Sequence, residues 1–181
     1  MVGKGDRNST TVAAIIATSS VILFACSSLR HALFQSGAFD LGIFDQAVYL
    51  ISSGDPPISS LLGFHILGDH AALIFYPLAL LYKIYPDVHW LLAVQAIALA
   101  SGALLTWMLA RQARLKTQQQ SAIAYVYLLY PLIFNLNLFD FHPEVIALPA
   151  LLLAILAARA GKIAWFCLAI AIVLACKAVL A

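Results

Sequence analysis

Residues 88–110, VHWLLAVQAIALASGALLTWMLA, carry no Asp, Glu, Lys or Arg, and their one histidine, His89, stands near the start. A helix needs roughly 20 consecutive apolar residues to cross the hydrocarbon core of a bilayer. This stretch is long enough, so it predicts a transmembrane helix.

The whole chain has the same character. Of its 181 residues, 64% are apolar and 10% are charged, whereas a soluble domain averages about 45–50% apolar and about 25% charged residues. So few charges cannot cover a water-soluble surface, and they also exclude a disordered chain, a collagen-like fibre and a nucleic-acid binder. We therefore expect an integral membrane protein whose main partner is the lipid bilayer, built as a single membrane domain over residues 1–181.

Other apolar stretches are long enough, or nearly so, to cross the bilayer as well. Together they predict an all-α, polytopic transmembrane helical bundle with five spans, at about residues 11–29, 88–110, 122–138, 145–158 and 163–181. The last two are separated only by Arg159-Ala160-Gly161-Lys162, which is typical of a tight turn between antiparallel helices.

Residues 71–85 are ambiguous, because this apolar segment is short, contains Pro77 and ends near Lys83. If it spans, the basic residues at 111–116 and at 159–162 fall outside, against the positive-inside tendency. If it lies at the interface, both groups fall inside, together with the N-terminus. The second topology is favoured, with a cytoplasmic N-terminus and a long outer loop, 30–87, that holds interfacial helices at about 39–53 and 71–85.

This topology places several scarce polar side chains at the outer face, where they are costly unless they meet water, a partner or a functional cavity. Asp40 and Asp45 differ by five positions, roughly 140° around a helix, so they do not form a tight pair on one face. Asp40 suits either a site or the N-cap of the helix at 39–53. Asp45 suits either a site or a solvated helix face.

Residues 140–144, DFHPE, join two spans. Pro143 suits the first turn of a helix, with His142 as its cap and Glu144 at the positive helix end. Alternatively, an extended backbone would point Asp140, His142 and Glu144 in one direction, where they could bind a divalent cation or relay a proton. His65, Asp69 and His70 on the same side allow a metal or phosphate site, although their spacing is not diagnostic.

Three separated motifs, in this order along the chain, resemble those of one family: SGAFDLGIFDQ at 36–46, LGDH at 67–70 and NLFDFHPE at 137–144. The family consists of bacterial predicted membrane proteins known as domain of unknown function 2079 (DUF2079), and the resemblance runs from about residue 34 to 177. It implies a location in the bacterial inner (plasma) membrane, with several spans.

The family is grouped with the GT-C membrane glycosyltransferases, which take sugars from polyprenyl-phosphate carriers. The resemblance implies that an acidic residue of the first outer loop, Asp40 or Asp45, acts as the catalytic base or binds a metal. A polyprenyl-phosphate-linked sugar would then be the donor, and basic groups such as Arg30 or Lys83 would steady its phosphate.

One departure from the family pattern concerns the end of the chain. Family members continue beyond the equivalent of Lys177 with Lys-Glu-Asp and further spans, whereas here Ala178-Val179-Leu180-Ala181 follows. The chain thus resembles a member truncated at its C-terminus. The alternative to an enzyme is a non-catalytic membrane protein, either a truncated remnant or a small subunit that packs against another membrane subunit in a larger complex.

Overall fold

The computed structural model describes residues 4–69 and 71–177, with side chains from residue 10 onward. Over these residues the chain is all-α, as the sequence predicts. Two short turns accompany the α-helices: η1, a π-helical turn at Ala38–Gly42, and η2, a 3-10 turn at Ile66–Gly68. The helices are α1 (Lys4–Ala32), α2 (Ile43–Ser53), α3 (Phe75–Tyr82), α4 (His89–Gln112), α5 (Thr117–Leu129), α6 (Pro131–Leu138), α7 (Glu144–Arg159) and α8 (Ile163–Cys176).

Three segments among these residues are long and apolar enough to cross a membrane: Thr10–Ala32, His89–Gln112 and Thr117–Leu138. They correspond to the first three predicted spans. Helix α8 is apolar but has only 14 residues, and α7 has 16. The part of the last predicted span beyond residue 177 lies outside the described residues. The chain is therefore an all-α membrane protein with three candidate spans and a shorter apolar helix.

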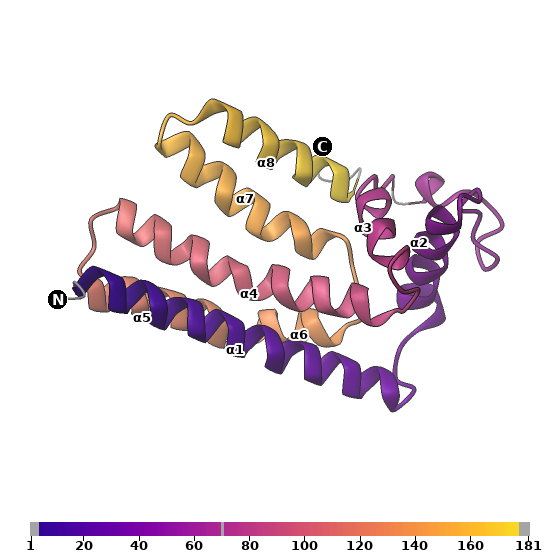
Figure 1. Ribbon diagram of the computed structural model, residues 1–181, viewed down its shortest axis with the longest axis horizontal. Coiled ribbons are helices and arrows are strands. Elements are labelled where there is room, and N and C mark those ends of the chain that lie inside the picture. Colours follow the sequence, from indigo (N-terminus) through magenta and orange to yellow (C-terminus); the bar gives the residue numbers. More distant parts are fainter. Residues whose placement is uncertain (1–3, 70, 178–181) are drawn as a thin grey trace.

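Helix α4 lies at the centre of the bundle. It packs against α1, α5 and α7, and α8 packs on the far side of α7 (Figure 1). In the most apolar part of α4, 56% of the residues are buried, against 17% in each of the other two candidate spans. Gly102 explains part of this close packing, because a Cβ atom there would come within 2.0 Å of the Tyr127 hydroxyl oxygen of α5. Small residues let membrane helices approach closely.

The third span is broken at Pro131, where the sequence contains a helix-breaking residue. Tyr130 adopts an extended conformation (φ −67°, ψ 121°), so α5 ends at Leu129 and α6 begins at the proline. The span starts at Thr117, five residues before the predicted boundary. The glutamines that follow are helical, because the Gln119 side chain accepts a hydrogen bond from the Lys116 backbone N–H (3.0 Å).

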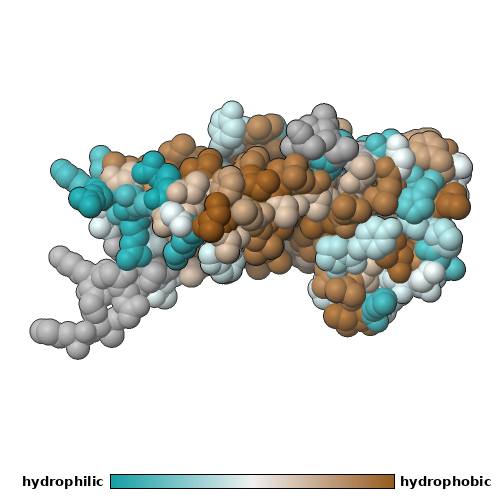
Figure 2. Space-filling view, turned by 90° about the horizontal axis from the view of Figure 1, so that it is seen from above, coloured by the Kyte–Doolittle hydropathy of each residue, from teal (hydrophilic) through white to brown (hydrophobic). Residues whose placement is uncertain are grey.

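The two ends of the bundle differ in charge. The start of α1, the α4–α5 connection and the α7–α8 turn lie at one end, and α2 and α3 stand across the opposite end (Figure 1). Figure 2 shows an apolar middle zone between two more polar ends, as expected for a membrane protein. The first end is called the basic end here. Its basic side chains are Arg111, Arg114, Lys116, Arg159 and Lys162.

Both predicted interfacial segments are helical at the opposite end. The first, predicted at 39–53, forms η1 and α2 and ends at Gly54, whose left-handed conformation (φ 85°) closes the helix. The second, predicted at 71–85, is helical only in α3. Its eight residues measure about 12 Å, too short to cross a bilayer.

Three buried phenylalanines hold these two helices on the bundle. The ring of Phe44 in α2 lies 5.3 Å from that of Phe75 in α3 and 6.1 Å from that of Phe141, which follows α6. The end of α8 also reaches α3, because the Ile74 N–H donates to the Ala175 carbonyl (2.9 Å). This end of the molecule is therefore a packed unit, and its polar side chains have fixed positions.

Candidate functional site

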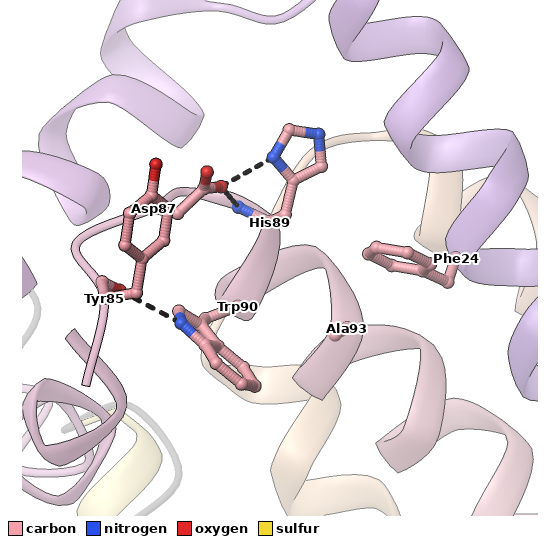
Figure 3. A pocket seen from close by; sticks show the side chains of 6 residues that line it. All are labelled: Phe24, Tyr85, Asp87, His89, Trp90 and Ala93. Carbon is pink, nitrogen blue, oxygen red and sulfur yellow. Dashed lines mark hydrogen bonds and ion pairs between the residues drawn. The ribbon is translucent and has the colours of Figure 1, made fainter.

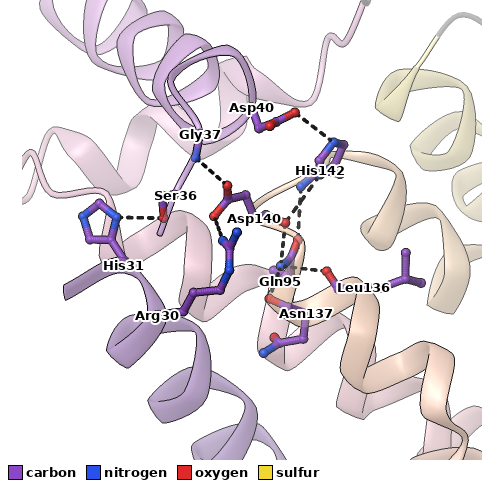
Figure 4. Close-up of polar contacts among 10 residues, drawn as sticks. All are labelled: Arg30, His31, Ser36, Gly37, Asp40, Gln95, Leu136, Asn137, Asp140 and His142. Atoms are coloured by element: carbon purple, nitrogen blue, oxygen red, sulfur yellow. Dashed lines mark hydrogen bonds and ion pairs between the residues drawn. The ribbon is translucent and has the colours of Figure 1, made fainter. Parts of the chain in front are cut away.

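Asp140, in the loop between α6 and α7, ties three parts of the chain together (Figure 4). Its side chain is only 4% exposed. One carboxylate oxygen accepts a hydrogen bond from Arg30 at the end of α1 (2.5 Å), and the other accepts one from the Gly37 backbone N–H (2.8 Å). The residue also has a positive φ of 80°, which a non-glycine residue keeps only where its surroundings hold it.

Gln95 of α4 holds the same loop through hydrogen bonds to its backbone. It is completely buried, and its amide nitrogen donates to the carbonyl oxygens of Asn137 (3.0 Å) and Asp140 (2.9 Å). Its amide oxygen accepts the His142 backbone N–H (3.1 Å). Polar backbone groups inside a membrane bundle need such internal partners. Gln95 is therefore a structural support of this loop and not only a packing residue of α4.

Asn137 completes the support. Its side-chain nitrogen donates to the Leu23 carbonyl oxygen on α1 (2.8 Å), and the residue is fully buried. This hydrogen bond joins α6 to α1. The loop is thus connected to α1 and α4 by buried hydrogen bonds.

Asp40 lies above this scaffold, at the surface. Its Oδ1 is 4.0 Å from Nε2 of His142, and its side chain is 43% exposed. The other oxygen folds back over Gly37, where an added Cβ atom would lie 2.6 Å from it. The N-cap residue of η1 is Gly37, so the predicted N-cap role of Asp40 is wrong.

The structure places Asp45 in different surroundings. It accepts a hydrogen bond from the Tyr82 hydroxyl (2.6 Å) and lines an open cavity of about 340 Å³ together with Tyr49, Asp87 and His89. Burial, reinforced by the bond to Asp45, raises the pKa of Tyr82 well above its usual value, so the phenol stays a donor. Asp40 and Asp45 therefore do not share one environment.

Asp87 and His89 form a pair at the start of α4 (Figure 3). The Asp87 carboxylate accepts the His89 backbone N–H (2.8 Å) and lies 2.6 Å from its ring Nδ1. The backbone bond, followed by the contact with the ring, lowers the pKa of Asp87. On the other side of the pair lies a mainly apolar cavity of about 260 Å³, which reaches Trp90 and Phe24 of α1.

Sequence reasoning missed Asp87, His89 and Tyr82 as parts of a site. A signal for the first two exists, because an aspartate just before a long apolar run is typical of a helix start. No local pattern pairs Tyr82 with Asp45, since the two residues lie 37 positions apart.

The predicted convergence of Asp140, His142 and Glu144 is wrong. The left-handed conformation of Asp140 turns its side chain toward α1, whereas Glu144 already belongs to α7 and pairs with Lys177. Burial acts to raise the pKa of Glu144, but the hydrogen bond and charge of Lys177 hold it below its usual range. The predicted capping is displaced by one residue, with Pro143 at the N-cap.

The other candidates do not join this cluster. His65 caps η2, where its Nδ1 accepts the Leu67 N–H (3.2 Å), and Asp69 ends the same turn. His70 lies outside the described residues. Arg30 is engaged by Asp140. Over the described part of the chain, no group of three or more His, Cys, Asp or Glu side chains is arranged to hold a metal ion, so the divalent-cation hypothesis has no ligand set there.

Comparison with known protein families gives one finding. Residues 30–181 match the family model described as predicted membrane protein (DUF2079). The match covers α2 to α8 and all three motifs quoted above. No curated protein and no solved structure matches the chain.

Proposed function

We propose that this chain, which belongs to the DUF2079 family of predicted membrane proteins, forms the donor-facing part of a membrane glycosyltransferase that uses polyprenyl-phosphate-linked sugars. The observation that carries the proposal is the position of Asp40. Its carboxylate is half exposed, lies 4.0 Å from His142 and belongs to η1, whose N-cap residue Gly37 is held by Asp140. A catalytic carboxylate needs this combination of access and fixed position.

In the proposed reaction Asp40 is the general base. It takes the proton from an acceptor hydroxyl while the acceptor oxygen forms a bond to C1 of the sugar. The bond between C1 and the phosphate oxygen breaks, and its electron pair leaves with the polyprenyl phosphate, so the configuration at C1 inverts. His142, whose Nε2 lies 4.0 Å from Oδ1 of Asp40, would help to position the carboxylate beside the acceptor.

Asp45 has a binding role in this proposal. With Tyr82 and Asp87 it lines the cavity of about 340 Å³, which offers carboxylate acceptors and phenol donors for sugar hydroxyls. Arg30 is less suited to the phosphate, because it already neutralises Asp140. Lys83 is exposed just after α3 and remains the candidate for the phosphate.

We also propose that residues 145–158 of α7 and helix α8 cross the membrane, which gives five spans. Their 16 and 14 residues measure about 24 Å and about 21 Å. They pack against each other, and α7 packs along α4. With the basic end in the cytoplasm, Asp40 and the cavity near Asp45 would face the outer side.

The test uses purified protein in liposomes with polyprenyl phosphates that carry radiolabelled hexoses or pentoses. The wild type should release polyprenyl phosphate and transfer label to an acceptor. Asp40→Asn should reduce transfer by about 10²–10⁴-fold, the usual contribution of a general base. Asp55→Asn is the matched control, because Asp55 is an exposed carboxylate just after α2, and it should leave transfer unchanged.

Two outcomes contradict the proposal. If Asp40→Asn transfers as fast as Asp55→Asn, Asp40 is not the base. If the wild type releases no polyprenyl phosphate from any donor, the non-catalytic alternative holds.

A further inference from the structure

A third cavity, of about 340 Å³, lies at the basic end, far from Asp40. It is formed where α4, α7 and α8 meet. Apolar side chains of these helices make up most of its wall, with Lys162 at its edge. Its lining includes Met108, Gln112, Leu153, Leu156, Lys162 and Trp165.

The edge of this cavity attracts anions. Lys162 is the N-cap residue of α8, so its ammonium group and the positive end of this 14-residue helix belong to the same edge. Arg159 lies in the same turn and is held by Gln112, because its Nε donates to the amide oxygen of that residue (2.9 Å).

Opposing charges are distant from the cavity. The carboxylates whose side chains the structure describes belong to the outer loop, to the start of α4, to the loop before α7 and to the first residue of α7, Glu144, at the opposite end of that helix from the cavity. An anion at Lys162 therefore meets only basic neighbours among the described side chains of the basic end.

The geometry points to a binding site for one anionic phospholipid, and we propose that its acyl chain fills the apolar cavity while its phosphate contacts Lys162 and the start of α8. Three features favour a lipid. The walls are apolar, the cavity is partly open to the surface of the bundle, and Trp165, 55% exposed, is the type of residue that is enriched at membrane interfaces. The basic edge favours an anionic over a zwitterionic headgroup, whose cationic part would be repelled.

The test measures quenching of Trp165 fluorescence by brominated lipids in nanodiscs. Trp90→Phe and Trp107→Phe leave Trp165 as the one tryptophan. At equal, low mole fractions in a phosphatidylcholine background, brominated phosphatidylglycerol should quench Trp165 more strongly than brominated phosphatidylcholine. The apparent affinity should fall about fivefold in Lys162→Gln, as expected for the loss of one basic contact.

Control variants separate this site from general attraction to the basic end. Lys162→Arg should keep the preference, and so should Arg114→Gln, which removes an exposed charge at the same end but outside the cavity. Circular dichroism checks that each variant is folded.

Three results would each overturn the proposal. They are equal quenching by the two brominated lipids, an unchanged preference in folded Lys162→Gln, and displacement of the lipid by glycerol 3-phosphate alone. The last result would indicate a phosphate site that does not use the acyl chain.

Discussion

The contact between Arg30 and Asp140 is predicted to couple the end of α1 to the loop before α7. Asp140 is 4% exposed and Arg30 27%, so the pair is largely shielded from water. Removing one partner of a buried pair costs about 3–5 kcal/mol, because the other charge stays without compensation. We therefore expect Arg30→Leu and Asp140→Leu each to lower the free energy of unfolding by about this amount.

The double variant should be destabilised much less than the sum of the single variants. It leaves no unpaired charge. The Gly37 N–H stays without its acceptor, which costs about 1–3 kcal/mol, and the strain of a leucine at the positive φ of position 140 is the same in the single Asp140→Leu variant, so it cancels in the comparison. The expected coupling energy is therefore at least about 2 kcal/mol. It can be measured by SDS titration in mixed micelles, followed by circular dichroism. Additive effects, within about 0.5 kcal/mol, would refute the reasoning.

Three further predictions concern residues around this pair. Gln95→Leu should lower the free energy of unfolding by at least about 2 kcal/mol in the same titration, because the backbone groups that it satisfies would be left buried without partners; a loss below about 0.5 kcal/mol would contradict this. Gly37→Ala should lower the rate of sugar transfer by a larger factor than it lowers the folding equilibrium constant, since its Cβ displaces the Asp40 carboxylate. An unchanged transfer rate would show that this position of Asp40 is not needed. The lowered pKa of Glu144 means that its contact with Lys177 contributes stability above the unfolded-state pKa of about 4.3 and loses it as the pH falls through the folded-state pKa. Unfolding measured against pH should therefore show a smaller acid loss in Lys177→Ala than in the wild type, and equal losses would contradict the assignment.

The sequence predicts the helices well, because hydropathy and helix-ending residues are local properties. Gly54 and Pro131 end helices where their conformational limits require it. The arrangement of basic residues at one end also follows from the order of the spans. The bounds of α7 differ by one residue at each end from those predicted, and α8 begins at the predicted residue.

The candidate site is only partly predictable. Asp40 and His142 come from two motifs of the sequence and lie together in the structure. The Asp140 side chain points toward α1 because its backbone is left-handed, a conformation that an aspartate adopts only in some contexts. The alternation of Asp140, His142 and Glu144 therefore predicted a convergence of these side chains that the structure does not have. Gln95 was missed because its partners follow it by more than 40 positions.

The central claim is that the end of the bundle that holds Asp40 and Asp45 and the basic end lie on opposite sides of a membrane. Ser53, the last residue of α2, and Gln119, at the start of α5, are both exposed. Single cysteines at these two positions test the claim in a variant without Cys26, Cys167 and Cys176. In intact cells, a membrane-impermeant maleimide should label position 53 at once and position 119 only after the membrane is opened. Labelling of both positions in intact cells, or of neither, would contradict the account.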